Sequence, residues 1–188
     1  TPTESPARLG ARKTPAEFIP EYSTTLELRV TLGPQDDYFT ADGINTFLSD
    51  FYEVTNECDR MGYRLKGKII EHVKGGDIIS DGIAMGAVQV PGHGQPIIML
   101  ADRQTTGGYT KIANVIWADL PKVAQAKPGD KIRFVKVTVN EAQQLIREME
   151  NRISAIKKAC VSREMVSARL LKLRIDGKTY EVKVEEIE

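Results

Sequence analysis

The chain has 188 residues, of which 41% are hydrophobic and 28% are charged. That apolar fraction is near the average for globular proteins, so the chain can build a core in one or two domains. Its 26 basic and 26 acidic residues cancel, which argues against a nucleic-acid-binding protein or a polybasic membrane-binding surface. No apolar run approaches the roughly 20 residues that span a bilayer. We therefore expect a cytoplasmic protein with neither nucleic acid nor membrane as a partner.

Cysteine and histidine are too scarce to suggest a metal centre. Cys58 and Cys160 lie about a hundred positions apart, and neither belongs to a C-x-x-C motif. The histidines, His72 and His93, are too few and too scattered for a zinc site. We expect two reduced thiols and no metal. A structural disulfide or a catalytic thiol is the alternative.

The first part of the chain predicts an arm, a strand and a short helix. Residues 1–22 carry four prolines and little apolar periodicity, which is typical of a linker or an extended arm. A half-buried strand follows, because apolar residues alternate with polar ones at Leu26, Leu28, Val30 and Leu32. Thr40 then suits a helix N-cap. The apolar residues after it fit one face of a short helix: Ile44, Phe47, Leu48 and Phe51.

Short apolar runs separated by turn residues occupy the middle of the chain. The candidate strands are 52–55, 63–65, 69–71, 77–79, 87–90, 96–101, 113–117 and 131–139. Glycine, proline and aspartate residues lie between these strands, a pattern typical of a β-barrel or a β-sandwich. A short helix is expected at 119–125, where Pro121 is tolerated only near the helix start. We therefore predict a mainly β domain over residues 23–139.

The C-terminal part of the chain predicts one long helix and a hairpin. Apolar residues repeat at intervals of three and four at Ala142, Leu145, Ile146, Met149, Ile153 and Ile156. Asn140 and Gln143 stand at the spacing of a capping box, so a helix is predicted within 140–160, over 141–158. Alternating apolar residues then flank Asp176-Gly177, which predicts a β-hairpin in 166–188. An isolated hairpin is marginal, so this tail needs something to pair with.

The segment 80–109 concentrates side chains that can bind a small molecule. It carries carboxylates at Asp81 and Asp102. Its amides and hydroxyls are Gln89, Gln95, Gln104, Thr105, Thr106 and Tyr109. Such strand–loop–strand segments place polar groups at a barrel mouth, where glycines let the backbone approach a ligand. The alternative is that glycines and aspartates only make tight turns while the amides and hydroxyls are solvated.

Two shorter segments offer further charged groups. Arg60 and Arg64 lie close to Asp59, and an arginine can hold a carboxylate, phosphate or carbamate through two parallel hydrogen bonds. The alternative is a set of surface ion pairs of little energetic weight. The segment 33–37 holds either a carboxylate pair or a polar loop that caps the next helix. No P-loop, dinucleotide-binding or Ser-His-Asp pattern is present, so any catalysis would use carboxylates, arginines, amides and backbone donors.

Four stretches make the sequence similar to a known family. They are GPQDD at 33–37, DRMGYRLKG at 59–67, IISDGIAMGAVQVPGHGQPIIMLADRQTTGGYTKIANVIWADLP at 78–121, and PGDKIRF at 128–134. On these residues the chain resembles the carboxyltransferase C/D subdomain family over about residues 26–153. This family includes allophanate hydrolase subunit 2, the carboxyltransferase part of urea carboxylase, and the C subunit of 5-oxoprolinase.

The resemblance implies a fold and a partner. Family members have a cyclophilin-like β-barrel, so the expected fold is mainly β: that barrel with a few short helices, then the long helix and the hairpin tail. Complete members carry another barrel-like half before this one. This chain lacks that half, so the resemblance implies that it is the C-terminal half of a longer subunit. It would then be inactive without its N-terminal half or a partner subunit.

The resemblance also implies two chemistries and a set of site residues. In the urea carboxylase type, CO₂ moves from carboxybiotin to a urea-like amide. In the 5-oxoprolinase type, a partner subunit takes part in ATP-dependent opening of a lactam. Asp81 and Asp102 would be catalytic, accepting amide N–H bonds or a proton, and Arg60 or Arg64 would bind the anion. The amide substrate would be held by Tyr63, Gln89, Gln104, Thr105, Thr106 and Tyr109.

The leading hypothesis is therefore a carboxyltransferase-type domain of an amide-processing enzyme. No cofactor is expected on this chain alone; carboxybiotin on a carrier, or ATP with a partner subunit, is implied by the resemblance. The tail at 171–188 looks like the opening strands of a biotin carrier domain, although it lacks the Met-Lys-Met motif and any similar hairpin would look alike. The alternatives are a regulatory module resembling the antagonist of a sporulation-kinase inhibitor, or a barrel that has lost its chemistry. The neighbouring coding sequences would distinguish these.

Overall fold

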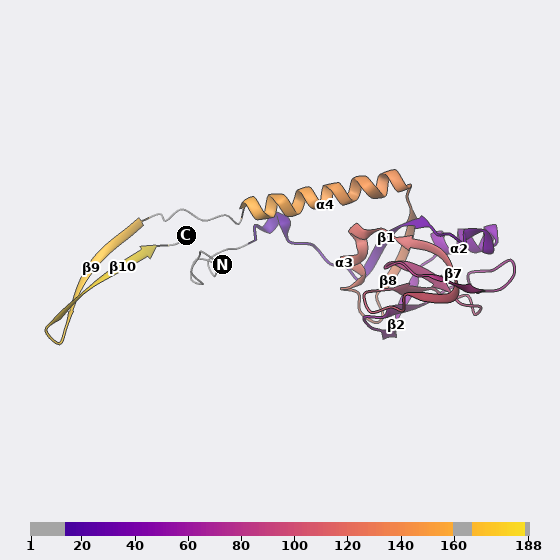
Figure 1. Ribbon diagram of the computed structural model, residues 1–188, viewed down its shortest axis with the longest axis horizontal. Coiled ribbons are helices and arrows are strands. Elements are labelled where there is room, and N and C mark those ends of the chain that lie inside the picture. The colour runs from indigo at the N-terminus through magenta and orange to yellow at the C-terminus, as the bar shows by residue number, and fades with distance from the viewer. Residues whose placement is uncertain (1–13, 160–166, 187–188) are drawn as a thin grey trace. The chain divides into compact units, whose positions relative to one another are not determined.

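The computed structural model describes residues 14–159 and 167–186 (Figure 1). They divide into two compact units. One unit spans residues 21–149, and the other contains the described residues before position 21 and after position 149. The candidate site residues named above all lie in the first unit, so the site can be described within that unit alone.

Eight strands belong to the first unit. They are β1 (Thr25–Leu32), β2 (Tyr52–Cys58), β3 (Gly62–Lys66), β4 (Asp77–Gly82), β5 (Ala87–Val90), β6 (Ile97–Met99), β7 (Thr106–Val115) and β8 (Lys131–Lys136). The order β1-β8-β2-β3-β6-β5-β7 closes into a barrel, because β7 pairs back with β1. The remaining strand, β4, pairs with β7 at the edge. The predicted mainly β barrel is therefore confirmed, and Figure 1 shows β1, β2, β7 and β8 gathered within it.

The barrel interior is filled by apolar side chains. Alternate strand residues point inward and are buried, among them Leu28, Val30, Val54, Leu65, Val88, Val90, Ile98, Ile112 and Ile132. The ring of Phe47 stacks on that of Phe134 with centroids 4.3 Å apart. Full burial of such a side chain stabilises the fold by roughly 1.5–3 kcal/mol. The interior of the barrel is therefore a packed core.

A second, smaller apolar cluster lies on the outer face of the barrel. It consists of Ile83, Ala87, Ile97 and Met99. The segment after β4 is fixed in place by two hydrogen bonds: Ile83 N donates to Thr105 O at 2.9 Å, and Arg103 Nε donates to Ile83 O at 3.0 Å. This segment therefore covers part of the outer face of the sheet.

The short helices differ in detail from those predicted. The helix α2 (Ala41–Ser49) begins after Thr40, whose hydroxyl accepts a hydrogen bond from Gly43 N at 2.9 Å, so the predicted N-cap is confirmed. The helix ends before Phe51, which is exposed rather than on its apolar face. The short helix predicted at 119–125 is instead a 3₁₀ turn, η3 (Trp117–Asp119), followed by α3 (Leu120–Val123).

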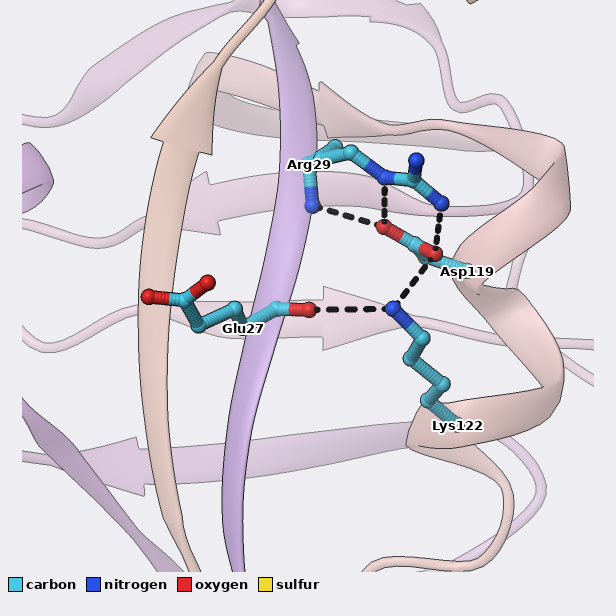
Figure 2. A network of polar contacts seen from close by, with 4 residues as sticks. All are labelled: Glu27, Arg29, Asp119 and Lys122. Carbon is cyan, nitrogen blue, oxygen red and sulfur yellow. Dashed lines mark hydrogen bonds and ion pairs between the residues drawn. The ribbon is translucent and has the colours of Figure 1, made fainter. Parts of the chain in front are cut away.

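A buried ion network ties this helical segment to β1 (Figure 2). The Asp119 carboxylate is fully buried and accepts hydrogen bonds from Arg29 Nε at 2.8 Å, Arg29 Nη2 at 2.6 Å and Arg29 N at 2.9 Å. Lys122 Nζ lies 2.9 Å from the same carboxylate and 3.4 Å from Glu27 O. Burial alone would raise the pKa of Asp119, but the hydrogen bonds from Arg29 and Lys122 outweigh it and lower that pKa. The network is a structural anchor.

Several predicted strands have other boundaries. Residues 69–71 form no strand, because Ile70 N bonds the loop carbonyl of Gly94. The predicted strand at 113–117 begins earlier, at Thr106, because β4 pairs with its first residues. The predicted strands at 96–101 and 131–139 are shorter, ending at Met99 and Lys136.

The long helix is confirmed, but its cap is not the predicted one. The helix α4 (Val139–Ala159) begins with a capping box made by Thr138 and Glu141 rather than by Asn140 and Gln143. Thr138 N donates to Glu141 Oε2 at 2.7 Å, and Glu141 N donates to Thr138 Oγ1 at 3.2 Å. The bond from the Thr138 backbone lowers the pKa of Glu141. No described side chain of α4 is fully buried.

The second unit contains a 3₁₀ turn and the predicted hairpin. The turn η1 (Ala16–Phe18) precedes the barrel, and β9 (Ser167–Ile175) pairs antiparallel with β10 (Lys178–Glu186). The turn between these strands has φ values of 50° at Asp176 and 77° at Gly177, the left-handed geometry that an Asp-Gly turn favours. Most of the predicted arm and Cys160 lie outside the described residues, and Cys58 forms no disulfide within the part of the chain that the structure describes. No helix within residues 14–159 and 167–186 is long and apolar enough to cross a membrane.

Candidate functional site

One row of side chains crosses the outer face of four neighbouring strands. Lys111 of β7 stands opposite Gln89 of β5, Gln89 opposite Ile97 of β6, and Ile97 opposite Arg64 of β3. Residues directly opposite each other project to the same face of a sheet. Their sequence neighbours fill the barrel interior: Ile112, Val88, Ile98 and Leu65. The row therefore faces outward, and it contains two of the predicted substrate-binding residues.

A buried lysine and an exposed aspartate form one end of this row. The side chain of Lys111 is 4% exposed, and its Nζ lies 3.1 Å from Asp81 Oδ2. Gln35 braces the pair, since its Nε2 donates to Asp81 Oδ2 at 3.2 Å and its Oε1 accepts from Lys111 N at 3.2 Å. The hydrogen bond from Lys111, followed by that from Gly82 N, lowers the pKa of Asp81. Asp81 is therefore ionised at neutral pH, and it acts as a hydrogen-bond acceptor rather than as a strong base.

Two glutamine amides converge on the same place. Gln89 is 1% exposed, and its Nε2 has no hydrogen-bond partner among the described residues. A Cβ on Gly107 would lie 3.2 Å from Gln89 Nε2 and 3.4 Å from Gln104 Nε2. Gly107 is the residue of β7 that stands opposite Asp81 of β4. The two amide donors and Ile83 Cδ1, which lies 2.7 Å from the same position, thus pack closely over Gly107.

We term these residues the amide cluster: Gln35, Asp81, Gln89, Gln104, Gly107 and Lys111. A buried donor that is left unpaired costs about 1–3 kcal/mol. An acceptor on a ligand, such as an amide carbonyl, would remove that cost. The neighbouring carboxylate can accept an N–H from the same ligand, and the ammonium adds positive charge. The cluster thus offers complementary contacts to both sides of a small planar amide.

Arg60 and Asp102 form a separate pair. Their side chains make two parallel contacts of 2.6 and 3.0 Å, and both side chains are exposed. The hydrogen bond from Arg60 lowers the pKa of Asp102, which makes this carboxylate a weak base as well. Asp102 N also donates to Arg60 O at 2.8 Å, so the pair ties the β2–β3 turn to the loop between β6 and β7. No hydrogen bond or ion pair joins it to the amide cluster within residues 14–159.

The remaining predicted residues are spread over the barrel. Tyr63 packs against the main core and donates from its hydroxyl to Ala126 O at 3.3 Å; burial raises its pKa. Arg64 lies at the far end of the row, where its Nε is 2.9 Å from Glu57 Oε2. Three others lie on β7 or just before it: Thr105, Thr106 and Tyr109. The structure therefore brings together Asp81, Gln89 and Gln104 but keeps Arg60, Asp102 and Tyr63 apart from them.

Three members of the amide cluster are not among the predicted site residues: Gln35, Gly107 and Lys111. Lys111 stands at the start of the largely apolar segment 112–117, and a lysine at the edge of such a segment is the pattern that could have drawn attention to it. Gln35 lies in the segment where the sequence allows a carboxylate pair. The structure instead uses its amide, while Asp36 and Asp37 lie in the 3₁₀ turn η2 (Asp36–Tyr38). Among the described residues, no group of three or more metal-ligating side chains is assembled.

Comparison with known proteins gives several similarities. The family described as carboxyltransferase domain, subdomain A and B, matches residues 1–136. The C subunit of 5-oxoprolinase from Haemophilus influenzae is 46% identical over 107 residues, which are 57% of this chain and 35% of that protein. The urea amidolyase of Lachancea kluyveri is 31% identical over 156 residues, 76% of this chain and 8% of that protein.

A solved structure is similar as well. The crystal structure of K. lactis urea amidolyase superimposes with a TM-score of 0.71 at 27% identity, over 80% of this chain and 10% of that one. The chain spans only 35% and 37% of the length of two 5-oxoprolinase relatives, from Haemophilus influenzae and Escherichia coli. The similarity therefore concerns one part of each of these larger proteins.

Proposed function

This chain belongs to the family of carboxyltransferase domains, and on that premise we propose that its amide cluster binds the planar amide on which the complete enzyme acts. The family inferred from the sequence motifs is confirmed, with the difference that the matched description names subdomains A and B where the motifs suggested C/D. The chain is a carboxyltransferase-like domain related to the C subunit of 5-oxoprolinase and to urea amidolyase. These relatives give no support to the regulatory alternative.

The observation that carries the proposal is the unpaired amide nitrogen of Gln89. It is buried, and it converges with a second amide nitrogen, that of Gln104, on the Cβ side of Gly107. A carbonyl oxygen of an amide substrate would accept hydrogen bonds from one or both amides. Its N–H would face the ionised carboxylate of Asp81, so the ligand would be oriented from both sides.

The charges of the cluster suit a reaction at an amide. When an amide nitrogen is carboxylated, or a lactam is activated, negative charge builds up on oxygen atoms near the reacting bond. The buried ammonium of Lys111 would stabilise that charge in a site with little water. Asp81 would position the nitrogen through its N–H rather than remove a proton, because its pKa is lowered. The activating group, carboxybiotin or ATP, would be supplied by a carrier or a partner subunit.

Two substrate classes share the chemistry that the cluster recognises. The higher identity with the 5-oxoprolinase relative favours a lactam. The match to urea amidolyase covers more of this chain, 76% against 57%, and favours a urea-like amide. Both molecules present a carbonyl oxygen and an N–H in one plane, so the same contacts would hold either. The relatives are a subunit or a part of a larger protein, and we propose that this chain likewise acts with a further domain or subunit.

The test compares variants of the assembled enzyme in assays of ATP-dependent consumption of urea and of 5-oxoproline. Gln89→Leu and Lys111→Met each remove one polar group and keep the side-chain volume. We expect each to lower turnover of the true substrate about 100-fold, the order of loss for one donor that stabilises a transition state. Lys131→Met, which removes an exposed lysine of β8, should leave turnover unchanged. Unaltered turnover in both cluster variants would contradict the proposal.

A further inference from the structure

A groove of about 450 Å³ opens on the outer face at the far end of the row from Lys111. Its polar lining comes from β2, β3 and the loop before β6: Thr55, Glu57, Arg64, Lys66, His93 and Gln95. Ile97 lines the groove and is also the neighbour of Gln89 in the row. The groove and the amide cluster therefore adjoin on one face of the barrel.

The groove carries more positive than negative charge. Arg64 and Lys66 contribute two basic side chains to its lining, and Glu57 contributes one carboxylate. Glu57 Oε2 lies 2.9 Å from Nε of the Arg64 guanidinium. A guanidinium has five N–H donors, so the pairing with Glu57 leaves donors for a second oxyanion.

His93 and Gln95 form a wall whose donors are fixed. Gln95 N donates to His93 Nδ1 at 3.1 Å, so the neutral imidazole carries its hydrogen on Nε2 and presents a donor there. The Gln95 side chain is held by two bonds to Gly67, from Gly67 N to Oε1 at 2.7 Å and from Nε2 to Gly67 O at 3.1 Å. This wall is therefore ordered before any ligand arrives, which lowers the entropy that binding would cost.

The spacing of the strands determines how long a ligand must be to contact both the groove and the amide cluster. Arg64 and Gln89 are separated by one intervening strand, β6. Neighbouring strands lie roughly 4.8 Å apart, so the two backbone positions are roughly 10 Å from each other. The side chains of both residues are long enough to reach toward a molecule lying over Ile97.

We propose that this groove is an oxyanion subsite, which binds a carboxylate or a phosphate through Arg64, Lys66 and His93. It would hold the charged end of a molecule whose amide end lies in the amide cluster; this last clause rests on the proposed function, whereas oxyanion binding does not. The ligand class is thus a small amide that carries an acidic group, or such an amide next to a transferred phosphate.

The experiment titrates the protein with inorganic phosphate and, separately, with succinate, while NMR follows the ring resonances of His93. Arg64→Ala and Lys66→Ala should each weaken binding of the preferred oxyanion at least fivefold. Glu57→Gln should tighten it, because the competing carboxylate is removed. Lys68→Ala is the matched control: this exposed lysine lies two residues beyond Lys66, pairs with Asp50 at 2.9 Å, and should change nothing.

The results separate this inference from the proposed function. Gln89→Leu should abolish amide binding and leave the affinity for phosphate or succinate unchanged. Arg64→Ala should weaken the binding of the oxyanion more than that of the amide. Tighter binding of succinate identifies a carboxylate site, and tighter binding of phosphate identifies a phosphate site. Equal losses in the Lys66 and Lys68 variants, or no change in His93 with either anion, would overturn the inference.

Discussion

The ammonium of Lys111 lies 3.1 Å from the carboxylate of Asp81, although the lysine side chain is 4% exposed and the aspartate side chain 53% exposed. A buried cation thus meets an anion that remains open to solvent. Removing one partner of a buried ion pair is costly, so this contact fixes Asp81 at the surface of the amide cluster. The arrangement keeps the lysine away from bulk water and leaves the aspartate accessible to a ligand.

The first test concerns the charge state of Asp81. Lys111→Met removes the hydrogen bond that contributes most to its lowered pKa, so we expect the pKa of Asp81 to rise toward the ordinary value of 3.8. Titration of the side-chain carboxyl by carbon-13 NMR measures this directly. Gln35→Leu removes a weaker contribution and should cause a smaller rise. An unchanged titration in the Lys111 variant would mean that the ion pair does not form in solution.

Gln89→Leu should stabilise the protein while it removes amide binding. The substitution replaces an unpaired buried amide by an apolar group of similar size, and we expect a gain of about 1 kcal/mol. Guanidinium unfolding is the suitable measurement, because urea is itself a candidate ligand. A destabilised variant would show that the Gln89 amide already has a partner in the free protein.

The close packing at Gly107 can be tested in the same way. Gly107→Ala would place a Cβ 2.7 Å from Ile83 Cδ1 and 3.2 Å from Gln89 Nε2. The end of Ile83 can move, so we expect a modest loss of stability together with at least tenfold weaker amide binding. Gly82→Ala is the control, because its Cβ would meet nothing within 4 Å. Calorimetry with the preferred amide compares the two variants, and equal affinities would place the ligand elsewhere.

Asp119 should govern part of the stability of the barrel toward acid. Its pKa is lowered in the folded protein, so its contribution is complete above the unfolded value near 3.8 and is lost as the pH falls through the lower folded value. Asp119→Asn leaves Arg29 and Lys122 without their carboxylate and should cost about 3–5 kcal/mol near neutral pH. Denaturation curves at neutral pH and below pH 3.8 should show this difference shrinking in acid. A cost independent of pH would exclude the ionised network.

Local patterns in the sequence are sufficient to predict much of the fold. The alternation in β1, the Thr40 cap and the Asp176-Gly177 turn depend on neighbouring residues, and each is present as predicted. The start of β7 is not predicted, because Gly107 and Gly108 look like a turn. Only pairing with β4, far along the chain, makes that segment a strand.

The site is harder to predict for a similar reason. Asp81 and Lys111 are 30 positions apart, and their contact depends on how β4 lies against β7. The sequence motifs group Tyr63 and Arg64 in one site, yet adjacent strand residues point to opposite faces, so Tyr63 lies toward the core. The sequence shows which polar side chains are available. Which of them come into contact depends on how the strands pair in the closed barrel.

The most direct test of the amide cluster follows the side-chain NH₂ of Gln89 in protein labelled with nitrogen-15 at its glutamines. Titration with 5-oxoproline and with urea should shift the Gln89 resonance as its unpaired N–H gains an acceptor, and the shift should vanish in the Gly107→Ala variant. Gln144 of α4, whose amide already donates to Glu148 Oε1 at 3.0 Å and lies in neither site, serves as the internal reference. A Gln89 resonance that stays in place while either amide binds would contradict the proposed site.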